Sequence, residues 1–74
     1  MYEAVHTFNR YKNNLRLEQD YDGDLWVRSY DTLVALIQDG ELIQSAWYSK
    51  TTQKHINYVA KELQLTLIKT FNKH

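Results

Sequence analysis

Cysteine is absent from this 74-residue chain, which removes two common ways of stabilising a small protein. Neither a disulfide nor a thiolate-bound zinc can hold the fold together. The chain also has no apolar run close to the roughly 20 residues that cross a bilayer. Residues 1–6 lack the basic and then apolar pattern of an export signal. We therefore expect a cytoplasmic protein without a membrane partner.

Motifs of catalysis are missing as well. The sequence contains no glycine-rich phosphate loop, no nucleophile elbow and no carboxylate pair placed for a cleft. Its three histidines, at positions 6, 55 and 74, have no helical metal-ligand spacing. We expect no catalytic residues, no metal site and no cofactor.

The acidic segment Asp20-Tyr21-Asp22-Gly23-Asp24 superficially resembles a calcium-binding loop. Its glycine comes too early, and Asp31 stands at the twelfth position, where such loops have glutamate. A hairpin turn with solvated carboxylates explains the segment better. Because exposed carboxylates contribute little to stability, we expect the fold to survive reversal of these charges.

Length and composition indicate one small globular domain, residues 1–74. A domain of this size buries only about 60% of the surface of its unfolded chain. Its core therefore rarely supplies more than roughly 3–5 kcal/mol of net stability. The ordinary apolar share, with six tyrosines and two tryptophans, argues against disorder.

The net charge is zero, but the charges are unevenly distributed along the chain. Residues 1–17 carry three cations and one carboxylate, a net charge of +2. Residues 18–41 carry seven carboxylates and one cation (−6), and residues 42–74 carry five cations and one carboxylate (+4). Such asymmetry can indicate a charged partner, although small domains often have charged surfaces without one.

Hydrophobic periodicity predicts an α+β fold, in which a small antiparallel meander of three to five strands is covered on one face by one helix. Asp22-Gly23 and Asp39-Gly40 are hairpin signals, because glycine readily adopts the positive φ of tight turns. The predicted strands are residues 2–8, 15–19, 25–30, 32–37 and 41–48.

The helix is predicted from about Thr52 to Leu63. Ile56, Val59, Ala60 and Leu63 have the i, i+3, i+4, i+7 spacing of one apolar stripe. We expect this stripe to pack on residues 33–37, with its contacts drawn from Leu33, Ala35, Leu36 and Ile37. Residues 65–71 can extend the stripe as helix or alternate as a final strand, and the β-branched alternation favours the strand.

The helix start combines hydroxyl, amide and cationic side chains. Any of Ser49, Thr51 and Thr52 can cap the helix, with Lys54 and His55 then facing solvent. Lysines are mildly unfavourable at the positive end of a helix dipole, which favours a bound phosphate or carboxylate there. Capping alone and anion binding both remain open. The candidate anion-binding residues are Ser49, Lys50, Thr51, Thr52, Lys54 and His55.

Two segments resemble a pattern found in small uncharacterised proteins of phages and other mobile elements. Residues 29–35 (SYDTLVA) match an "SY-x-T-x-VA" strand, and residues 48–55 (YSKTTQKH) match "YS-x-TT-x-KH". The resemblance covers roughly residues 25–60 and is more specific in its second part. It implies an accessory protein of a phage that binds and blocks host machinery, as anti-CRISPR proteins of this size and α+β character do. These proteins have no settled activity that the resemblance could carry over to this chain.

Two functions follow as hypotheses. The first is inhibition of a host defence protein, in which the carboxylates of residues 18–41 imitate nucleic-acid phosphates and aromatic residues act as anchors. Its candidate binding residues are Asp20, Tyr21, Asp22, Asp24, Trp26 and Tyr30. The alternative is nucleic-acid binding by the basic segment 49–61, with Lys50, Lys54 and Lys61 on phosphates and Tyr48 and Tyr58 against bases. A homodimer is also possible, because so small a domain leaves a sheet face or edge uncovered.

Overall fold

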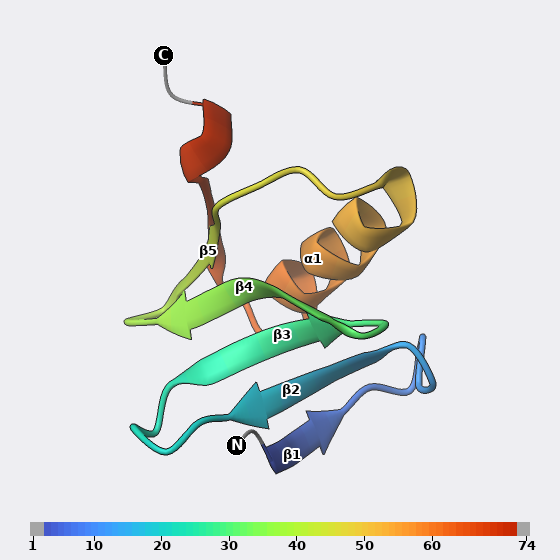
Figure 1. Ribbon diagram of the computed structural model, residues 1–74. Coiled ribbons are helices and arrows are strands. Elements are labelled where there is room, and N and C mark those ends of the chain that lie inside the picture. The colour runs from blue at the N-terminus through green and yellow to red at the C-terminus, as the bar shows by residue number, and fades with distance from the viewer. Residues whose placement is uncertain (1–2, 73–74) are drawn as a thin grey trace.

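The computed structural model describes residues 3–72 and contains one sheet with one helix packed against it (Figure 1). The strands are β1 (Glu3–Thr7), β2 (Leu15–Gln19), β3 (Leu25–Ser29), β4 (Thr32–Gln38), β5 (Glu41–Gln44) and β6 (Thr66–Lys69). The helix α1 (Lys50–Glu62) lies between β5 and β6 in the chain, and a short 3₁₀ helix, Thr70–Asn72, follows β6.

The six strands lie side by side in the order of the sequence. The first five form antiparallel pairs, whereas β6 runs parallel to β5 because α1 carries the chain back to the end of the sheet where β5 starts. The predicted α+β class is confirmed, with six strands instead of three to five and one parallel pair. The strand interpretation of residues 65–71 is confirmed for Thr66–Lys69.

The turns explain how the sequence forms this meander. Asp39 and Gly40 join β4 to β5 as a two-residue turn with φ of 52° and 77°, which matches the twist of the paired strands. The other predicted hairpin, at Asp22-Gly23, joins β2 to β3. The turn between β3 and β4 was not predicted, and there Tyr30 adopts a φ of 55° without being glycine.

Both ends of α1 are capped. The side chain of Ser49 accepts a hydrogen bond from the Thr52 N–H at 3.1 Å, so of the three candidates Ser49 is the N-cap. At the other end the Leu65 N–H donates to the Ala60 carbonyl, and Gln64 has a φ of 55°. This is a Schellman ending with glutamine at the left-handed position that glycine usually occupies.

Replacing Gln64 with glycine should therefore stabilise the protein. Relief of the left-handed strain, offset by the greater chain entropy of glycine, predicts a net gain of about 0.5–1 kcal/mol. Denaturant unfolding measures the change. Lys54→Gly, at an exposed helical position, is the control and should cost about 1 kcal/mol. Destabilisation by Gln64→Gly would contradict the assignment.

The hydrophobic core lies between α1 and the face of the sheet that α1 covers. It consists of Phe8, Leu15, Leu17, Val27, Val34, Ala35, Leu42, Ile56 and Val59. Leu63 is half-buried and packs against this cluster, as do Ile37 and Leu67. Among the described residues, no helix is both long and apolar enough to cross a membrane.

Two of the four alternative contacts predicted for the helix lie on the other side of the sheet. Leu36 pairs with Trp26, and Leu33 pairs with Arg28, on the side of the sheet turned away from α1. The pairing shifts register between Val27 and Arg28, so Val34 occupies a bulge and the alternation of β4 changes there. Ala35 and Ile37 face the core as predicted, whereas Leu33 and Leu36 lie on the uncovered face. We call this uncovered side of the sheet the open face.

Candidate functional site

An apolar row crosses the open face. The register places Trp26 of β3 beside Leu36 of β4, Leu36 beside Ile43 of β5, and Ile43 beside Ile68 of β6. None of these four residues belongs to the core cluster or packs against it. No element of the described chain covers this row. The row was not predicted from the sequence, because β4 is apolar on both faces.

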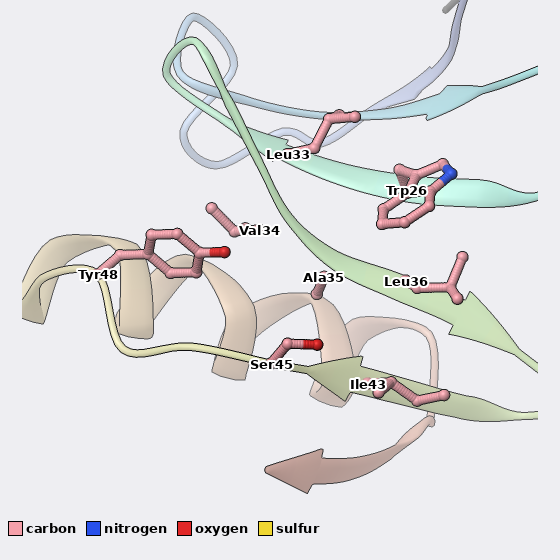
Figure 2. A pocket seen from close by; sticks show the side chains of 8 residues that line it. All are labelled: Trp26, Leu33, Val34, Ala35, Leu36, Ile43, Ser45 and Tyr48. Carbon is pink, nitrogen blue, oxygen red and sulfur yellow. The ribbon is translucent and has the colours of Figure 1, made fainter. Parts of the chain in front are cut away.

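A pocket of about 240 Å³ opens on the same face (Figure 2). Its walls come from neighbouring strands and from the segment that leads to α1. They are formed by Trp26, Leu33, Val34, Ala35, Leu36, Ile43, Ser45 and Tyr48. Tyr48 stands on the side of the pocket opposite Trp26 and is 40% exposed. A mostly apolar pocket with a few hydroxyl groups can receive an apolar side chain.

An ion pair network continues the open face toward β2. Glu18 lies beside Trp26 in the register and is only 5% exposed. Its Oε2 atom lies 2.6 Å from Arg16 Nε and 2.8 Å from Arg28 Nε. Burial alone would raise the pKa of Glu18, but hydrogen bonds and charge from Arg28 and Arg16 outweigh it and lower that pKa. Glu18 is thus ionised and held between two guanidinium groups.

The predicted acidic loop folds around Asp20. The Oδ1 atom of Asp20 accepts the N–H groups of Asp22 and Asp24, each at 3.0 Å, and Oδ2 accepts the indole N–H of Trp26 at 3.0 Å. The Trp26 hydrogen bond is the main reason that the pKa of Asp20 is lowered. Asp20 therefore orders the loop and the indole and is not the solvated turn carboxylate that was expected, so we now expect reversal of its charge to cost stability.

The candidate partner-binding residues separate into two places. Carboxylate oxygens of Asp20, Asp22 and Asp24 lie within 4.8 Å of one another, Tyr21 beside them is 86% exposed, and Trp26 is bonded to the loop. Tyr30 lies in the β3–β4 turn, at the opposite end of the sheet (Figure 1). The first five residues thus form one surface, and Tyr30 belongs to another.

Most carboxylates gather at one end of the molecule. The β2–β3 loop, the β4–β5 turn, the start of β1 and the end of α1 all lie at this end (Figure 1). Seven of the nine carboxylate residues are placed here: Glu3, Asp20, Asp22, Asp24, Asp39, Glu41 and Glu62. Lys61 is the one cation that the described chain places among them. We call this region the acidic end.

The opposite end is basic and aromatic. It holds the β1–β2 connection, the β3–β4 turn and the start of α1. Its exposed cations are Arg10, Lys12, Lys50 and Lys54, and its exposed aromatic residues are Tyr30, Trp47 and Tyr48. We call this region the basic end. The uneven charges of the sequence thus become two poles along the strand direction.

The candidate anion-binding residues do not form one exposed site. Ser49 is used as the cap, and Lys50, Thr51 and Lys54 are exposed. Thr52 and His55 instead turn toward the sheet: Ser29 Oγ lies 3.1 Å from Thr52 Oγ1 and 2.7 Å from His55 Nδ1. The expectation that His55 faces solvent is wrong, since it is only 1% exposed.

His55 is enclosed by uncharged groups. Its ring lies 4.5 Å from that of Tyr11 and 5.5 Å from that of Tyr30, centroid to centroid, and Ser29 and Thr52 complete the cluster. Burial lowers the pKa of His55, because the charged imidazolium loses its hydration there. The cluster holds a neutral histidine and gives the helix start a structural role.

We expect this burial to make stability depend on pH. Above about pH 6.5 His55 is neutral in both states, but below it the unfolded chain takes up a proton that folded His55 resists. The free energy of unfolding should therefore fall as the pH drops from about 7 toward 5. His55→Gln should flatten this decline while leaving the loss below about pH 4 that the lowered pKa values of Glu18 and Asp20 predict. Urea unfolding across this range tests both, and an unchanged decline in the variant would contradict the assignment.

Comparison with known proteins identifies a family without assigning an activity. A family model described as "Family of unknown function (DUF8033)" matches residues 1–70. The chain belongs to this family. The match to DUF8033 spans every strand of the sheet and the whole of α1. No curated protein and no solved structure matches the chain.

Proposed function

We propose that the protein is a non-catalytic binding protein that docks its acidic end onto a basic surface of a partner protein. The observation that carries the proposal is the gathering of seven carboxylate residues from four separate segments at one end of the fold. Such a concentration of charge speeds encounter with a basic surface and disfavours acidic ones.

The acidic loop supplies an anchor as well as charge. Tyr21 projects beside Asp22 with 86% of its surface exposed, and a tyrosine rimmed by polar groups is a frequent binding hot spot. Asp20 holds the loop backbone in place through two N–H groups, so the loop is already ordered before a partner binds. Preorganisation of this kind lowers the entropic cost of association.

A basic groove that normally holds nucleic acid is the partner surface that this end fits. Carboxylates at fixed positions can occupy the phosphate-binding sites of such a groove and compete with nucleic acid. Together with the resemblance to proteins of phages, this supports inhibition of a nucleic-acid-dependent defence protein in the host cytoplasm. The inhibition would need no catalysis, metal or cofactor.

Capture of partners from host lysate tests the proposal. The variant Asp22→Lys with Glu62→Lys reverses two exposed charges of the acidic end that form no strand pairs. We expect it to lose the captured protein, because a basic partner surface would then repel it, and to keep the wild-type melting temperature. Lys50→Glu with Lys54→Glu, at the basic end, is the matched control and should retain the partner. Loss of capture in the control alone would contradict the proposal.

Nucleic-acid binding is a second candidate, favoured by one observation. Three exposed aromatic residues, Tyr30, Trp47 and Tyr48, lie at the same end as the exposed Lys50 and Lys54. Single-stranded binding sites combine cations with aromatic faces in this way. A mobility shift with single- and double-stranded DNA and RNA at low salt distinguishes the two candidates. If the wild type shifts these probes and Lys50→Glu with Lys54→Glu does not, the second candidate replaces the first.

A further inference from the structure

The open face carries charges of opposite sign at its two ends. Side chains alternate along a strand, so Arg16, Glu18 and Asp20 of the β2 strand and its extension lie on one face. Trp26 and Arg28 of β3 lie on the same face, with Trp26 beside Glu18 and Arg28 beside Arg16. Asp24 immediately precedes β3 and accepts a hydrogen bond from the Asp20 N–H through its carbonyl, so the same alternation places Asp24 on this face. The arginines therefore stand toward the basic end, and the two aspartates toward the acidic end.

The spacing of these charges is symmetric about the apolar row. Arg16 and Asp20 lie two residues to either side of Glu18, and Arg28 and Asp24 lie two residues to either side of Trp26. A two-fold axis that runs across the strands along this row would exchange the two ends of the sheet. It would place each arginine over an aspartate of a second copy, on the same strand.

We propose that the open face is a self-complementary surface that binds a second copy of this chain. In the resulting pair the two sheets pack face to face, with Trp26, Leu36 and Ile43 of one copy against the same residues of the other. Arg16 meets Asp20 of the second copy, and Arg28 meets its Asp24. The interface is isologous, as in most homodimers, and produces a closed dimer and no chain of copies.

The energetics of the open face favour association with a second copy. Burial of the apolar row and of the pocket walls drives association. Glu18 would face its own counterpart, but Arg16 and Arg28 neutralise it within each copy. Six strands about 4.8 Å apart and about five residues long make a face of roughly 500 Å², so the interface lies at the small end of stable ones. We therefore expect a dimer that forms in the micromolar range.

This proposal does not rest on the proposed function: the acidic end shares Asp20 and Asp24 with the open face, but Tyr21, Asp22 and Glu62 lie outside that face. Its test needs only the purified chain, which must associate with itself, whereas the test of the proposed function needs a host partner. Two single substitutions in one loop distinguish a specific contact on the open face from a general effect of charge on association. Asp24 lies on the open face beside Trp26, and Asp22 lies two residues earlier, at the tip of the turn.

Sedimentation velocity of the purified chain, from low to high micromolar concentration, is the test. We expect dimer for the wild type, monomer for Leu36→Glu at every concentration, and dimer for Thr51→Glu on the exposed side of α1. Asp24→Lys should weaken association at least tenfold, whereas Asp22→Lys should not. Circular dichroism must show the wild-type fold for each variant used. The wild type as monomer at high micromolar concentration, or equal weakening by Asp22→Lys and Asp24→Lys, overturns the proposal.

Discussion

Ile56→Ala is expected to unfold most of the protein at room temperature. Ile56 is fully buried at the centre of the interface between α1 and the sheet. Truncating a buried isoleucine to alanine typically costs about 2–5 kcal/mol, because apolar contacts are lost and a cavity remains. A domain of this size has a net stability of only roughly 3–5 kcal/mol. Thermal melting followed by circular dichroism should therefore show a broad transition at low temperature, or none.

Two other positions in or next to α1 provide the controls. Leu63→Ala truncates a half-buried side chain just after the last residue of the helix and should cost less than Ile56→Ala. Lys54→Ala changes an exposed residue of the same helix and should leave the melting temperature within a few degrees of the wild type. If Ile56→Ala melted like Lys54→Ala, the packing of α1 on the sheet would be contradicted.

The main features of this fold follow from local patterns in the sequence. Asp39-Gly40 predicts the β4–β5 turn because both residues must adopt positive φ, and aspartate and glycine do so more readily than other residues. The spacing of Ile56 and Val59 predicts the buried face of α1 because that periodicity is set by the helix itself. Signals of this kind depend on neighbouring residues only.

Features that depend on pairing between strands were not predictable in the same way. Tyr30 turns the chain from β3 to β4 at a φ of 55°, and tyrosine carries no local signal for that conformation. The bulge at Val34 then moves Leu33 to the open face, although residues 33–37 form one apolar run. The pocket on the open face could not be predicted without that register.

The position of His55 had a signal in the sequence. Thr52, His55, Ile56 and Val59 share the i, i+3, i+4, i+7 spacing, so the polar pair belongs to the buried stripe. Polarity alone suggested that Thr52 and His55 are exposed. Ser29 instead supplies the hydrogen-bond partner that offsets the cost of burying these polar groups. That partner lies 26 residues away in the sequence and becomes visible only in the folded chain.

The acidic end depends both on local sequence patterns and on the way the strands pair in the fold. The acidic middle of the sequence was evident, and its two hairpin turns were predicted. Only the meander brings those turns to one end of the sheet, and only the parallel return of β6 adds Glu62 to them. The acidic segment was therefore predictable from the sequence, but the addition of Glu62 to the acidic end was not.

Breaking the buried amide pair of Gln44 and Gln53 should also have a large effect. Gln44 Nε2 donates to Gln53 Oε1 at 2.7 Å, and Gln53 Nε2 donates back to Gln44 Oε1 at 3.1 Å. Gln44 is fully buried and joins the end of β5 to the first turns of α1 through this pair. Gln53→Leu removes both bonds and leaves the Gln44 carbonyl oxygen buried without that donor, at a cost of about 1–3 kcal/mol.

The double variant separates the role of the pair from the size of the side chains. Gln44→Leu with Gln53→Leu replaces both amides with apolar groups of similar volume, so no buried amide of the pair is left without its partner. Since removing both partners can be nearly neutral, the double variant should be more stable than the sum of the two single effects predicts. Urea unfolding of the four proteins gives the coupling free energy, which we expect to be at least about 1 kcal/mol. Additive effects would mean that the two glutamines stabilise the join between β5 and α1 independently of each other.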